Sequence, residues 1–283
     1  MPRFYLLFLF LIFFTQSFYP SSLPSFQRII SLSPLLTEEI FILGSDRDLI
    51  ADTIYCVNPE GAKYKPKIGN MTDIDVEKIF SLRPDLILAS GLTEPEQLDK
   101  LKSLKIRVEI FNQPGNFNEI CAQLFRLAKL LGREEKANLI TDEARKSVSA
   151  LSSAASRYSK KRVFVEIGSN PLFTVGSGSF INDFIVMAGG INVAVNSGTG
   201  LYSLETVIRD DPEVIIISDM GMNVPDEKNY WLKFKTISAV RNNAIYSIDS
   251  YSLCSPTPAD FPLTLEKLIR LIHPESGEKG SLR

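Results

Sequence analysis

Side chains that could perform acid–base, nucleophilic or metal chemistry are few in this sequence. His273 is the sole histidine, and Cys56, Cys121 and Cys254 stand far apart, with no CxxC spacing. Metal capture by side chains needs several converging ligands, and hydrolysis needs a nucleophile beside a base. The sequence has neither pattern, so we predict no enzyme activity and no metal site. For His273 we expect a surface or capping position.

Nucleotide and nucleic-acid binding are also disfavoured. Residues 176–179 are rich in Gly and Ser but lack the lysine of a phosphate-binding loop, and we interpret them as a turn before a helix. The formal net charge is −2 and no Lys/Arg-rich run appears, so nothing electrostatic indicates a nucleic-acid partner.

A repeated pattern places one glutamate in each half of the chain. Glu77 precedes Pro84 by seven residues, and Glu205 precedes Pro212 by the same interval. Each proline is followed by an acidic residue and then by an apolar run typical of a buried strand. Two matching βα units predict two lobes of matching fold, and clefts between domains are where ligands usually bind.

Short apolar runs alternate with helical segments throughout both halves. This alternation predicts an α/β fold of two Rossmann-like lobes, each with a parallel central sheet covered by helices. The expected strands are 28–31, 49–51, 85–89, 107–111, 162–167, 213–218 and 244–248, and the expected helices are 33–44, 75–81, 96–103, 120–131, 179–188 and 262–272. We expect Cys121 in the core and Trp231 packed between a helix and a sheet.

One long helical segment, residues 133–158, stands between the two units. Its apolar residues recur at steps of three or four, which places them on one helix face. They are Ala137, Ile140, Ala144, Val148, Leu151 and Ala155. We therefore predict one long α-helix (133–159) that rigidly joins an N-terminal lobe (25–132) to a C-terminal lobe (160–283). An ordinary helix inside one large domain is the alternative.

The first residues differ from the rest of the chain. Arg3 precedes an apolar run over residues 4–14, and small and polar residues follow it. A basic start, a short apolar run and a small-residue exit are typical of a secretory signal peptide, and the run is shorter than the roughly 20 residues that span a bilayer. We expect a signal peptide over about residues 1–17 and export to the periplasm or beyond. An uncleaved anchor is the alternative.

Taken in order, the motifs resemble a known family: the periplasmic solute-binding proteins of ABC importers that carry cobalamin, haem and iron–siderophores on a helical backbone. The opening run, residues 28–34, and Thr37-Glu38 are similar to the start of that family. The further matching segments are 68–70, 75–77, 82–87, 164–167, 170–174, 189–192, 239–246 and 272–275. The match covers nearly all of the chain after the signal segment, and the likeness is greatest to the cobalamin-binding branch.

The resemblance implies a monomer that captures a small-molecule ligand and delivers it to an ABC permease dimer with its ATPase. The ligand would be cobalamin, another corrinoid, haem or a ferric siderophore, with no cofactor needed. A sensor or scavenger that does not transport is an alternative. The resemblance assigns permease docking to Glu77 and Glu205, one on each lobe. The helix macrodipole favours a carboxylate in the first turn of a helix, so capping of each helix remains open as their role.

The resemblance also implies ligand contacts on loops at the facing ends of the lobes. Those contacts are Ser33, Pro34, Tyr55, Cys56, Asn70, Met71 and Ser90 in the first lobe, and Phe173, Tyr202, Asp249, Tyr251 and Cys254 in the second. Aromatic and Met side chains suit a flat, partly apolar ring. Met71 and Ser90 stand where the cobalamin branch usually has Trp, and no Arg appears in residues 252–257.

Cys56 and Cys254 both map to these facing loops. They could form a disulfide across the cleft, which requires Cα atoms within about 7 Å, or supply a thiolate to a metal centre. They could equally be two unrelated buried thiols. An odd number of cysteines leaves at least one unpaired within the chain.

Overall fold

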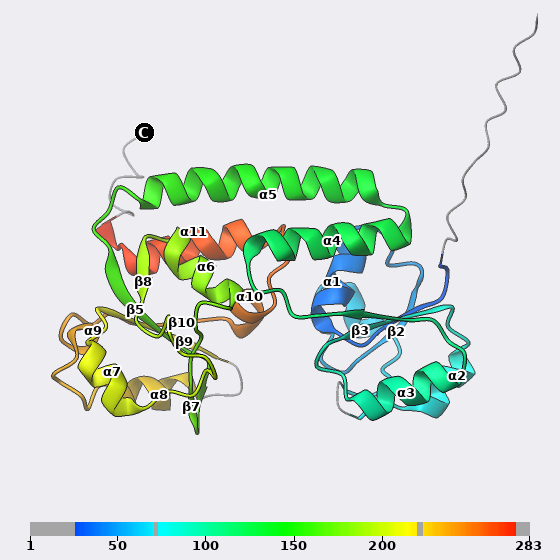
Figure 1. The fold of residues 1–283 in the computed structure, drawn as a ribbon, viewed down its shortest axis with the longest axis horizontal. Helices are drawn as coiled ribbons and strands as arrows, with labels where there is room; N and C mark the ends of the chain where they lie inside the picture. Colours follow the sequence, from blue (N-terminus) through cyan, green and yellow to red (C-terminus); the bar gives the residue numbers. More distant parts are fainter. Residues whose placement is uncertain (1–25, 71–72, 220–222, 276–283) are drawn as a thin grey trace, which may run out of the picture.

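Two parallel sheets form the framework of the molecule. The computed structural model describes residues 26–70, 73–219 and 223–275, and within these ranges it contains two four-stranded sheets at opposite ends of the molecule (Figure 1). Helices cover both faces of each sheet. The prediction of two α/β lobes with parallel sheets is thus confirmed.

The first sheet has the order β2 (Leu49–Asp52), β1 (Ile29–Ser31), β3 (Leu86–Ser90) and β4 (Val108–Phe111), all parallel. Neighbouring residues of a strand point to opposite faces, so Ile29 and Ile30 enter different cores. One face packs against α1 (Pro34–Ile42) and α4 (Phe117–Leu131), and the other packs against α2 (Val76–Leu82) and α3 (Pro95–Ser103).

The second sheet has the order β10 (Ile245–Ile248), β9 (Val214–Ser218), β5 (Lys161–Glu166) and β8 (Gly190–Asn192), again all parallel. Val163 and Phe164 are adjacent and belong to different cores. One face packs against α6 (Phe180–Met187) and α11 (Phe261–Ile272), and the other packs against α7 (Leu204–Asp210), α8 (Val224–Trp231) and α9 (Ser238–Arg241). The remaining short elements are η1 (Glu60–Tyr64), β6 (Gly168–Ser169), β7 (Leu172–Phe173) and α10 (Ser250–Cys254).

The repeated pattern around Pro84 and Pro212 has a structural reason. In both lobes the helix before the proline, α2 or α7, ends at a residue with left-handed backbone, Arg83 (φ 47°) or Asp211 (φ 44°). A left-handed residue followed by proline stops a helix sharply. The chain is thereby returned to the sheet at the same point in each lobe.

The acidic residue after each proline fastens the next strand to its neighbour. Asp85 accepts the backbone N–H of Arg28 at 3.0 Å, and Glu213 accepts that of Arg162 at 3.0 Å. The same two arginines also bond the residue at which α2 or α7 ends. Arg28 Nε donates to the Arg83 carbonyl at 3.0 Å, and Arg162 Nε donates to the Asp211 carbonyl at 2.9 Å. The two lobes are therefore matching in detail as well as in strand order.

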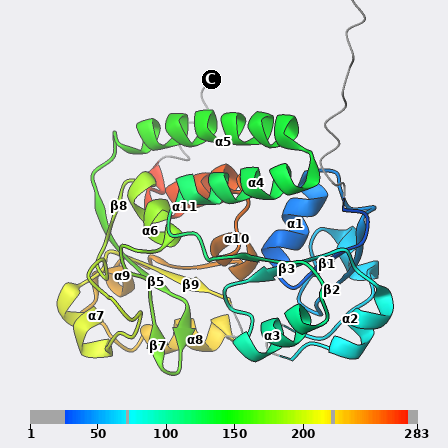
Figure 2. The same ribbon diagram turned by 45° about the vertical axis from the view of Figure 1, so that its right-hand side comes forward.

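The helix α5 (Glu134–Ala155) joins the lobes, as predicted. Its 22 residues extend about 33 Å at 1.5 Å per residue. Ala137 packs in the first lobe's core, whereas Ala144, Val148 and Ala155 pack in the second lobe's core. Figures 1 and 2 show α5 lying across the top of both lobes, above a layer formed by α4 and α11.

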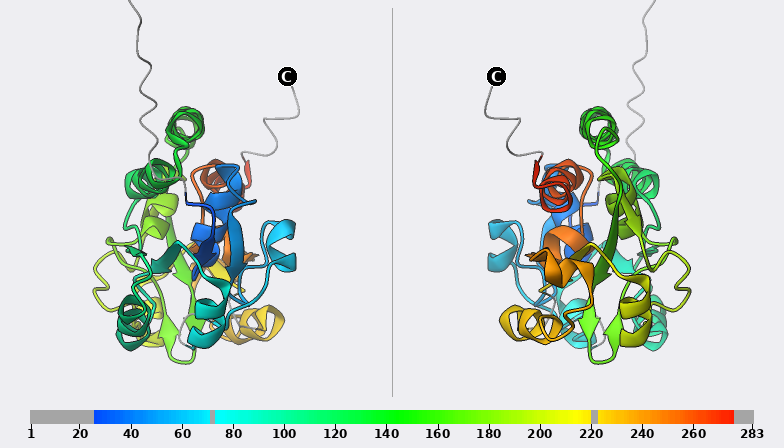
Figure 3. Two further views of the ribbon diagram at one scale, coloured as in Figure 1. Left: turned by 90° about the vertical axis from the view of Figure 1, so that its right-hand side faces the viewer. Right: turned by 90° about the vertical axis from the view of Figure 1, so that its left-hand side faces the viewer.

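A second helix, α4, also bridges the two cores, which the sequence did not indicate. Leu124 and Leu127 belong to the first lobe's core, but Phe117 and Cys121 belong to the second lobe's core. The ring of Phe117 lies 4.5 Å from that of Phe261, centroid to centroid, and its backbone N–H donates to Asp183 at 2.9 Å. Figure 1 shows α4 and α11 lying largely end to end, one over each lobe, and the end-on views of Figure 3 place both beneath α5.

Two single residues test the sequence expectations. Trp231 is fully buried against the sheet, and its indole N–H donates to Glu166 at 2.6 Å, which confirms the expected packing. His273 ends α11, but it is completely buried, with Nε2 3.0 Å from the Ala188 carbonyl oxygen. His273 therefore has the expected capping position, as the C-cap residue of α11, but the alternative surface position is wrong, because its ring is buried and stacks on the Tyr158 ring at 4.9 Å between centroids.

Among the described residues, no helix has the length and apolar character needed to cross a bilayer. The expected signal peptide, residues 1–17, lies outside the described ranges.

Glu166 leads to a prediction about stability and pH. Burial raises the pKa of its carboxyl from 4.5 to about 8, an effect that the Trp231 indole partly offsets and Glu227 reinforces. The folded state then binds this proton more tightly than the unfolded state does. Protonation of Glu166 therefore stabilises the folded state at low pH, and this stabilisation is lost as the pH rises through about 8. We expect Tm to fall by at least about 4 °C between about pH 5.5 and pH 8.5, and Glu166→Gln to fall less steeply.

Thermal unfolding followed by circular dichroism measures this slope. Glu96→Gln, an exposed carboxyl in the first turn of α3, serves as the control and should keep the wild-type slope. A Tm that rises over this pH range, or an unchanged slope in Glu166→Gln, would contradict the prediction.

Candidate ligand-binding cleft

The carboxyl ends of strands from both sheets meet at one cavity. β1, β3 and β4 end beside it in the first lobe, and β5 ends beside it in the second. Its volume of about 520 Å³ lies within the roughly 300–1,000 Å³ typical of small-molecule sites. Ligands of open parallel sheets bind beyond the carboxyl ends of the strands, so this cavity is the candidate site.

The wall of the cavity is apolar with several uncharged polar groups. The apolar residues are Pro34, Leu35, Leu36, Leu92, Phe111, Pro114, Ile167, Val175, Phe180 and Ile181. The polar residues are Ser33, Ser90, Asn112, Gln113, Gln123, Ser179, Cys254 and Ser255, with Gly178 among them. None of these described wall residues is Asp, Glu, Lys, Arg or His.

Four of the expected ligand contacts lie on this wall: Ser33, Pro34, Ser90 and Cys254. Ser33 occupies the N-cap position of α1, but its hydroxyl accepts no capping hydrogen bond. Pro34 begins the helix, as the sequence predicts. The ends of β1 and β3 and the start of α1, all in the first lobe, therefore lie on the same wall as α10 of the second lobe.

Three further expected contacts lie around the loop after β2. Tyr55 is exposed, whereas Cys56 is fully buried, with its sulfur 3.2 Å from the Thr37 hydroxyl. Lys67 holds this loop by donating to Asp52 at 2.6 Å and to the Cys56 carbonyl at 2.9 Å. The structure thus places Cys56 beneath the surface and away from the cavity wall.

Asn70, the third of these contacts, is half-buried, and its side-chain oxygen accepts the backbone N–H of Asp73 at 2.7 Å. Met71 lies outside the described residues.

Phe173 and Tyr202, expected from the second lobe, lie apart from the cavity wall. Both are half-buried, and the Tyr202 hydroxyl donates to Asp210 at 2.6 Å. Burial and Asp210 raise the pKa of Tyr202 to about 12. Tyr202 lines a separate hollow together with Asp210 and Thr206.

Asp249 and Tyr251 belong to α10, although the sequence indicated a loop there. Asp249 caps this helix by accepting the backbone N–H of Ser252 at 2.7 Å. Burial acts to raise the pKa of Asp249, but the hydrogen bonds from Ser252 outweigh it and hold the pKa below the usual value. The Tyr251 hydroxyl lies beside the Glu38 carboxyl of the first lobe but has no well-oriented hydrogen-bond partner.

All three cysteines are free. The structure therefore contains no disulfide between Cys56 and Cys254. Burial raises the pKa of both thiols, so neither is poised as a thiolate. Cys121 is buried in α4, which confirms the core position expected for it. The described residues include no group of three or more His, Cys, Asp or Glu side chains that could hold a metal ion.

Glu77 and Glu205 are both exposed in the first turns of matching helices. Other residues cap these helices: Asp75 caps α2 by accepting the Lys78 backbone N–H, and Ser203 caps α7 by accepting the Thr206 backbone N–H. Within the described chain, the Glu77 carboxylate makes no hydrogen bond or ion pair. The backbone N–H of Glu205 and the Ser203 hydroxyl lower the pKa of the Glu205 carboxyl. Both helices lie on the side of the molecule opposite α5, at its two ends (Figure 1).

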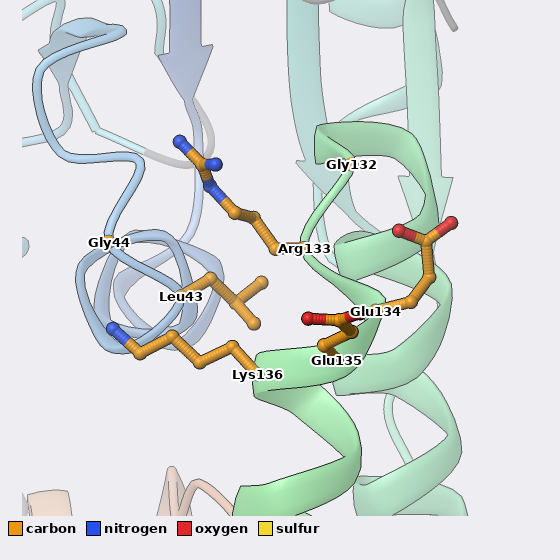
Figure 4. Close-up of a pocket in the computed structure, with 7 residues that line it drawn as sticks. All are labelled: Leu43, Gly44, Gly132, Arg133, Glu134, Glu135 and Lys136. Carbon is orange, nitrogen blue, oxygen red and sulfur yellow. The ribbon is translucent and has the colours of Figure 1, made fainter. Parts of the chain in front are cut away.

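A larger hollow, of about 650 Å³, lies at the turn between α4 and α5. Figure 4 shows that it is lined by the end of α1 and by the charged side chains of Arg133, Glu134, Glu135 and Lys136. It involves the first lobe alone and lies away from the carboxyl ends of the strands. The smaller cavity between the lobes is therefore the better candidate for the ligand site.

The sequence missed most of the apolar wall. The segment 112–114 follows a predicted strand and could have been found from that position. The wall residues of α4 and α6, Gln123 among them, have no such signal, because nothing in a helical sequence tells which neighbour each face meets.

Comparison with known proteins decides the family. The model of the family described as periplasmic binding protein matches residues 29–252. The chain belongs to this family, and the resemblance found in its motifs is confirmed. Its relatives and structural neighbours are solute-binding proteins, not enzymes.

Three matches illustrate the range of the family. The vitamin B12-binding protein of Yersinia pestis (strain Pestoides F) is 30% identical over 220 residues, which cover 77% of this chain and 78% of the relative. The crystal structure of the periplasmic vitamin B12 binding protein BtuF of Vibrio cholerae matches with a TM-score of 0.76 and 25% identity, over 89% of this chain and 98% of that one. A periplasmic heme binding protein from Pseudomonas aeruginosa, at 22% identity, shares the fold with a TM-score of 0.79, over 88% and 93% of the two chains.

The position of Cys254 can be tested by thiol labelling. Cys254 is half-buried on the cavity wall, whereas Cys56 and Cys121 are at most 1% exposed. We expect one thiol per chain to react slowly with a maleimide under native conditions and all three to react after denaturation. Cys254→Ala should abolish native labelling, and Cys121→Ala should leave it intact. Native labelling that persists in Cys254→Ala would contradict this placement.

Proposed function

We propose that this protein is the extracytoplasmic binding component of an ABC importer and that it captures a corrinoid of the vitamin B12 type between its lobes. The single observation that carries the proposal is the apolar, uncharged cavity where the carboxyl ends of the two sheets face each other. The vitamin B12-binding relative, which aligns over most of both chains, supports the same ligand class.

The chemistry of the wall favours a corrinoid over the other ligands carried by this class. Haem presents carboxylates and requires an axial ligand from His, Cys, Met or Tyr. Ferric siderophores are often anionic and are bound through Arg or Lys. Among the described wall residues the only such iron ligand is Cys254, whose thiol is protonated because burial raises its pKa, and no cation is present. A corrin ring edged with neutral carboxamides suits a wall of aliphatic, hydroxyl and amide groups.

Export and delivery complete the proposal. Residues 1–17 would direct secretion, and the protein would act as a monomer whose lobes, 25–132 and 160–283, are held by the helix 133–159. Because α4 and α5 each enter both cores, capture would involve little movement of one lobe against the other. The permease dimer would contact the face opposite α5.

Glu77 and Glu205 are the proposed docking carboxylates. They occupy equivalent positions in matching helices, both are exposed, and neither is needed as an N-cap. A permease with two-fold symmetry could present one arginine to each. Exposed ion pairs contribute only about 0–1 kcal/mol each in isolation, so the two sites would act mainly by orienting the cleft over the permease.

The double variant Glu77→Lys/Glu205→Lys tests this function. We expect the purified variant to bind cyanocobalamin with wild-type affinity in equilibrium dialysis, because both residues lie away from the cavity wall. Uptake of labelled cyanocobalamin by cells that carry the cognate permease should fall about tenfold or more, since two attractive contacts become repulsive.

Glu135→Lys is the matched control, because Glu135 is an exposed carboxyl in the first turn of α5 on the opposite side of the molecule. It should leave uptake unchanged. Wild-type uptake in the double variant would exclude the docking role, and absence of cyanocobalamin binding by the wild type would exclude the ligand.

A further inference from the structure

A fully buried glutamate lies behind the cavity wall, next to the wall residue Gln123. Glu39 is 0% exposed in α1, among apolar residues of the first lobe. A buried carboxyl needs hydrogen-bond partners or it destabilises the fold. Its Oε1 accepts a long hydrogen bond from Gln123 Nε2 at 3.4 Å, and its Oε2 has no partner at all.

Gln123 connects this carboxyl to the cavity. It projects from α4, it is half-buried, and it is one of the residues that line the wall. One end of its carboxamide meets Glu39, while its other polar atom has no hydrogen bond within the described residues. The two ends of an amide are interchangeable in a hydrogen-bond network, but in either orientation one polar atom remains for the cavity.

Glu39 is suited to hold such an amide because it is uncharged near neutral pH. Burial raises the pKa of its carboxyl to about 8, which the Gln123 hydrogen bond partly offsets and the neighbouring Glu38 reinforces. A protonated carboxyl can both donate and accept, so it can match either orientation of the amide.

The surrounding titratable groups support the same state. Glu38, the residue before Glu39 in α1, faces Asp260 and Tyr251 of the second lobe. Burial together with Asp260 raises the pKa of Glu38 to about 8 as well. From α4, the group that meets Glu39 is the neutral Gln123. No basic side chain of the described residues is paired with Glu39, so nothing draws it into the charged form.

We propose that Glu39 is a positioning residue of the cleft, which holds the Gln123 carboxamide so that its outer atom hydrogen-bonds an uncharged polar group of the ligand. On the corrinoid assignment proposed above, on which this inference rests, that group is a carboxamide at the edge of the ring. An amide reads an amide through complementary donor and acceptor atoms. Gln123 then contributes to specificity, and Glu39 acts through it.

Equilibrium dialysis against cyanocobalamin, followed by its visible absorbance, tests the inference. Gln123→Leu should weaken binding about two- to tenfold, the range expected for one lost hydrogen bond. Glu39→Leu should weaken it similarly, because the amide loses its support. Glu39→Gln keeps a neutral hydrogen-bonding group of the same shape, so it should bind as the wild type does at about pH 7.

The pH profile separates positioning from simple packing. Ionisation of Glu39 places a charge behind an uncharged wall, so wild-type affinity should be constant up to about pH 7 and fall about three- to tenfold by pH 9. Glu38 titrates over the same range, so Glu39→Gln should make this fall clearly smaller, and Glu38→Gln should leave the part that is due to Glu39. Glu166→Gln removes an equally buried carboxyl of the second lobe and should keep the wild-type binding profile. Circular dichroism confirms that each variant is folded.

The outcomes distinguish this inference from the proposed function. If the wild type fails to bind cyanocobalamin, the corrinoid assignment fails and this inference fails with it. If the wild type binds, then unchanged affinity in Gln123→Leu, or a pH-dependent fall as large in Glu39→Gln as in the wild type, overturns the role of Glu39 alone.

Discussion

The molecule depends on two helices that each pack into both hydrophobic cores. α5 contributes Ala137 to one core and Val148 to the other, and α4 does the same with Leu127 and Phe117. Opening the lobes widely would either break backbone hydrogen bonds in these helices or expose apolar surface, at about 25 cal/mol per Å². The cleft is therefore largely pre-formed, and a ligand spends little of its binding energy on closing it.

A pre-formed cleft with no charged residue on its described wall selects by shape and by neutral polar contacts. Two carboxyls of α1, whose first residues line the wall, follow the same rule, because burial raises the pKa of Glu38 and Glu39 to about 8 and keeps both mainly protonated at neutral pH. Charged groups appear instead at the outer surface, where Glu77 and Glu205 begin matching helices. On the proposed function, capture and delivery would thus use different chemistry in different parts of the molecule.

The fold could be predicted from local signals, whereas the cavity could not. The stripe along residues 133–158, the Glu-to-Pro repeat and the Ser33-Pro34 helix start each arise from a few neighbouring residues, and the structure contains all three. The wall of the cleft arises from contacts between segments far apart in the sequence. No local sequence pattern therefore indicates that Gln123 lines the cavity or that α4 packs into both cores. Cys56 illustrates the same limit: the sequence places it on a loop facing the cleft, and its inward turn onto Thr37 has no sequence signal.

The most direct test of the central claim is the absorption spectrum and metal content of the protein purified from its native host after growth with cyanocobalamin. We predict corrin absorption bands that co-purify with the protein and about one cobalt atom per chain, as expected for one ligand in one cleft. A Soret band with iron in place of cobalt, or a protein without any chromophore, would contradict it.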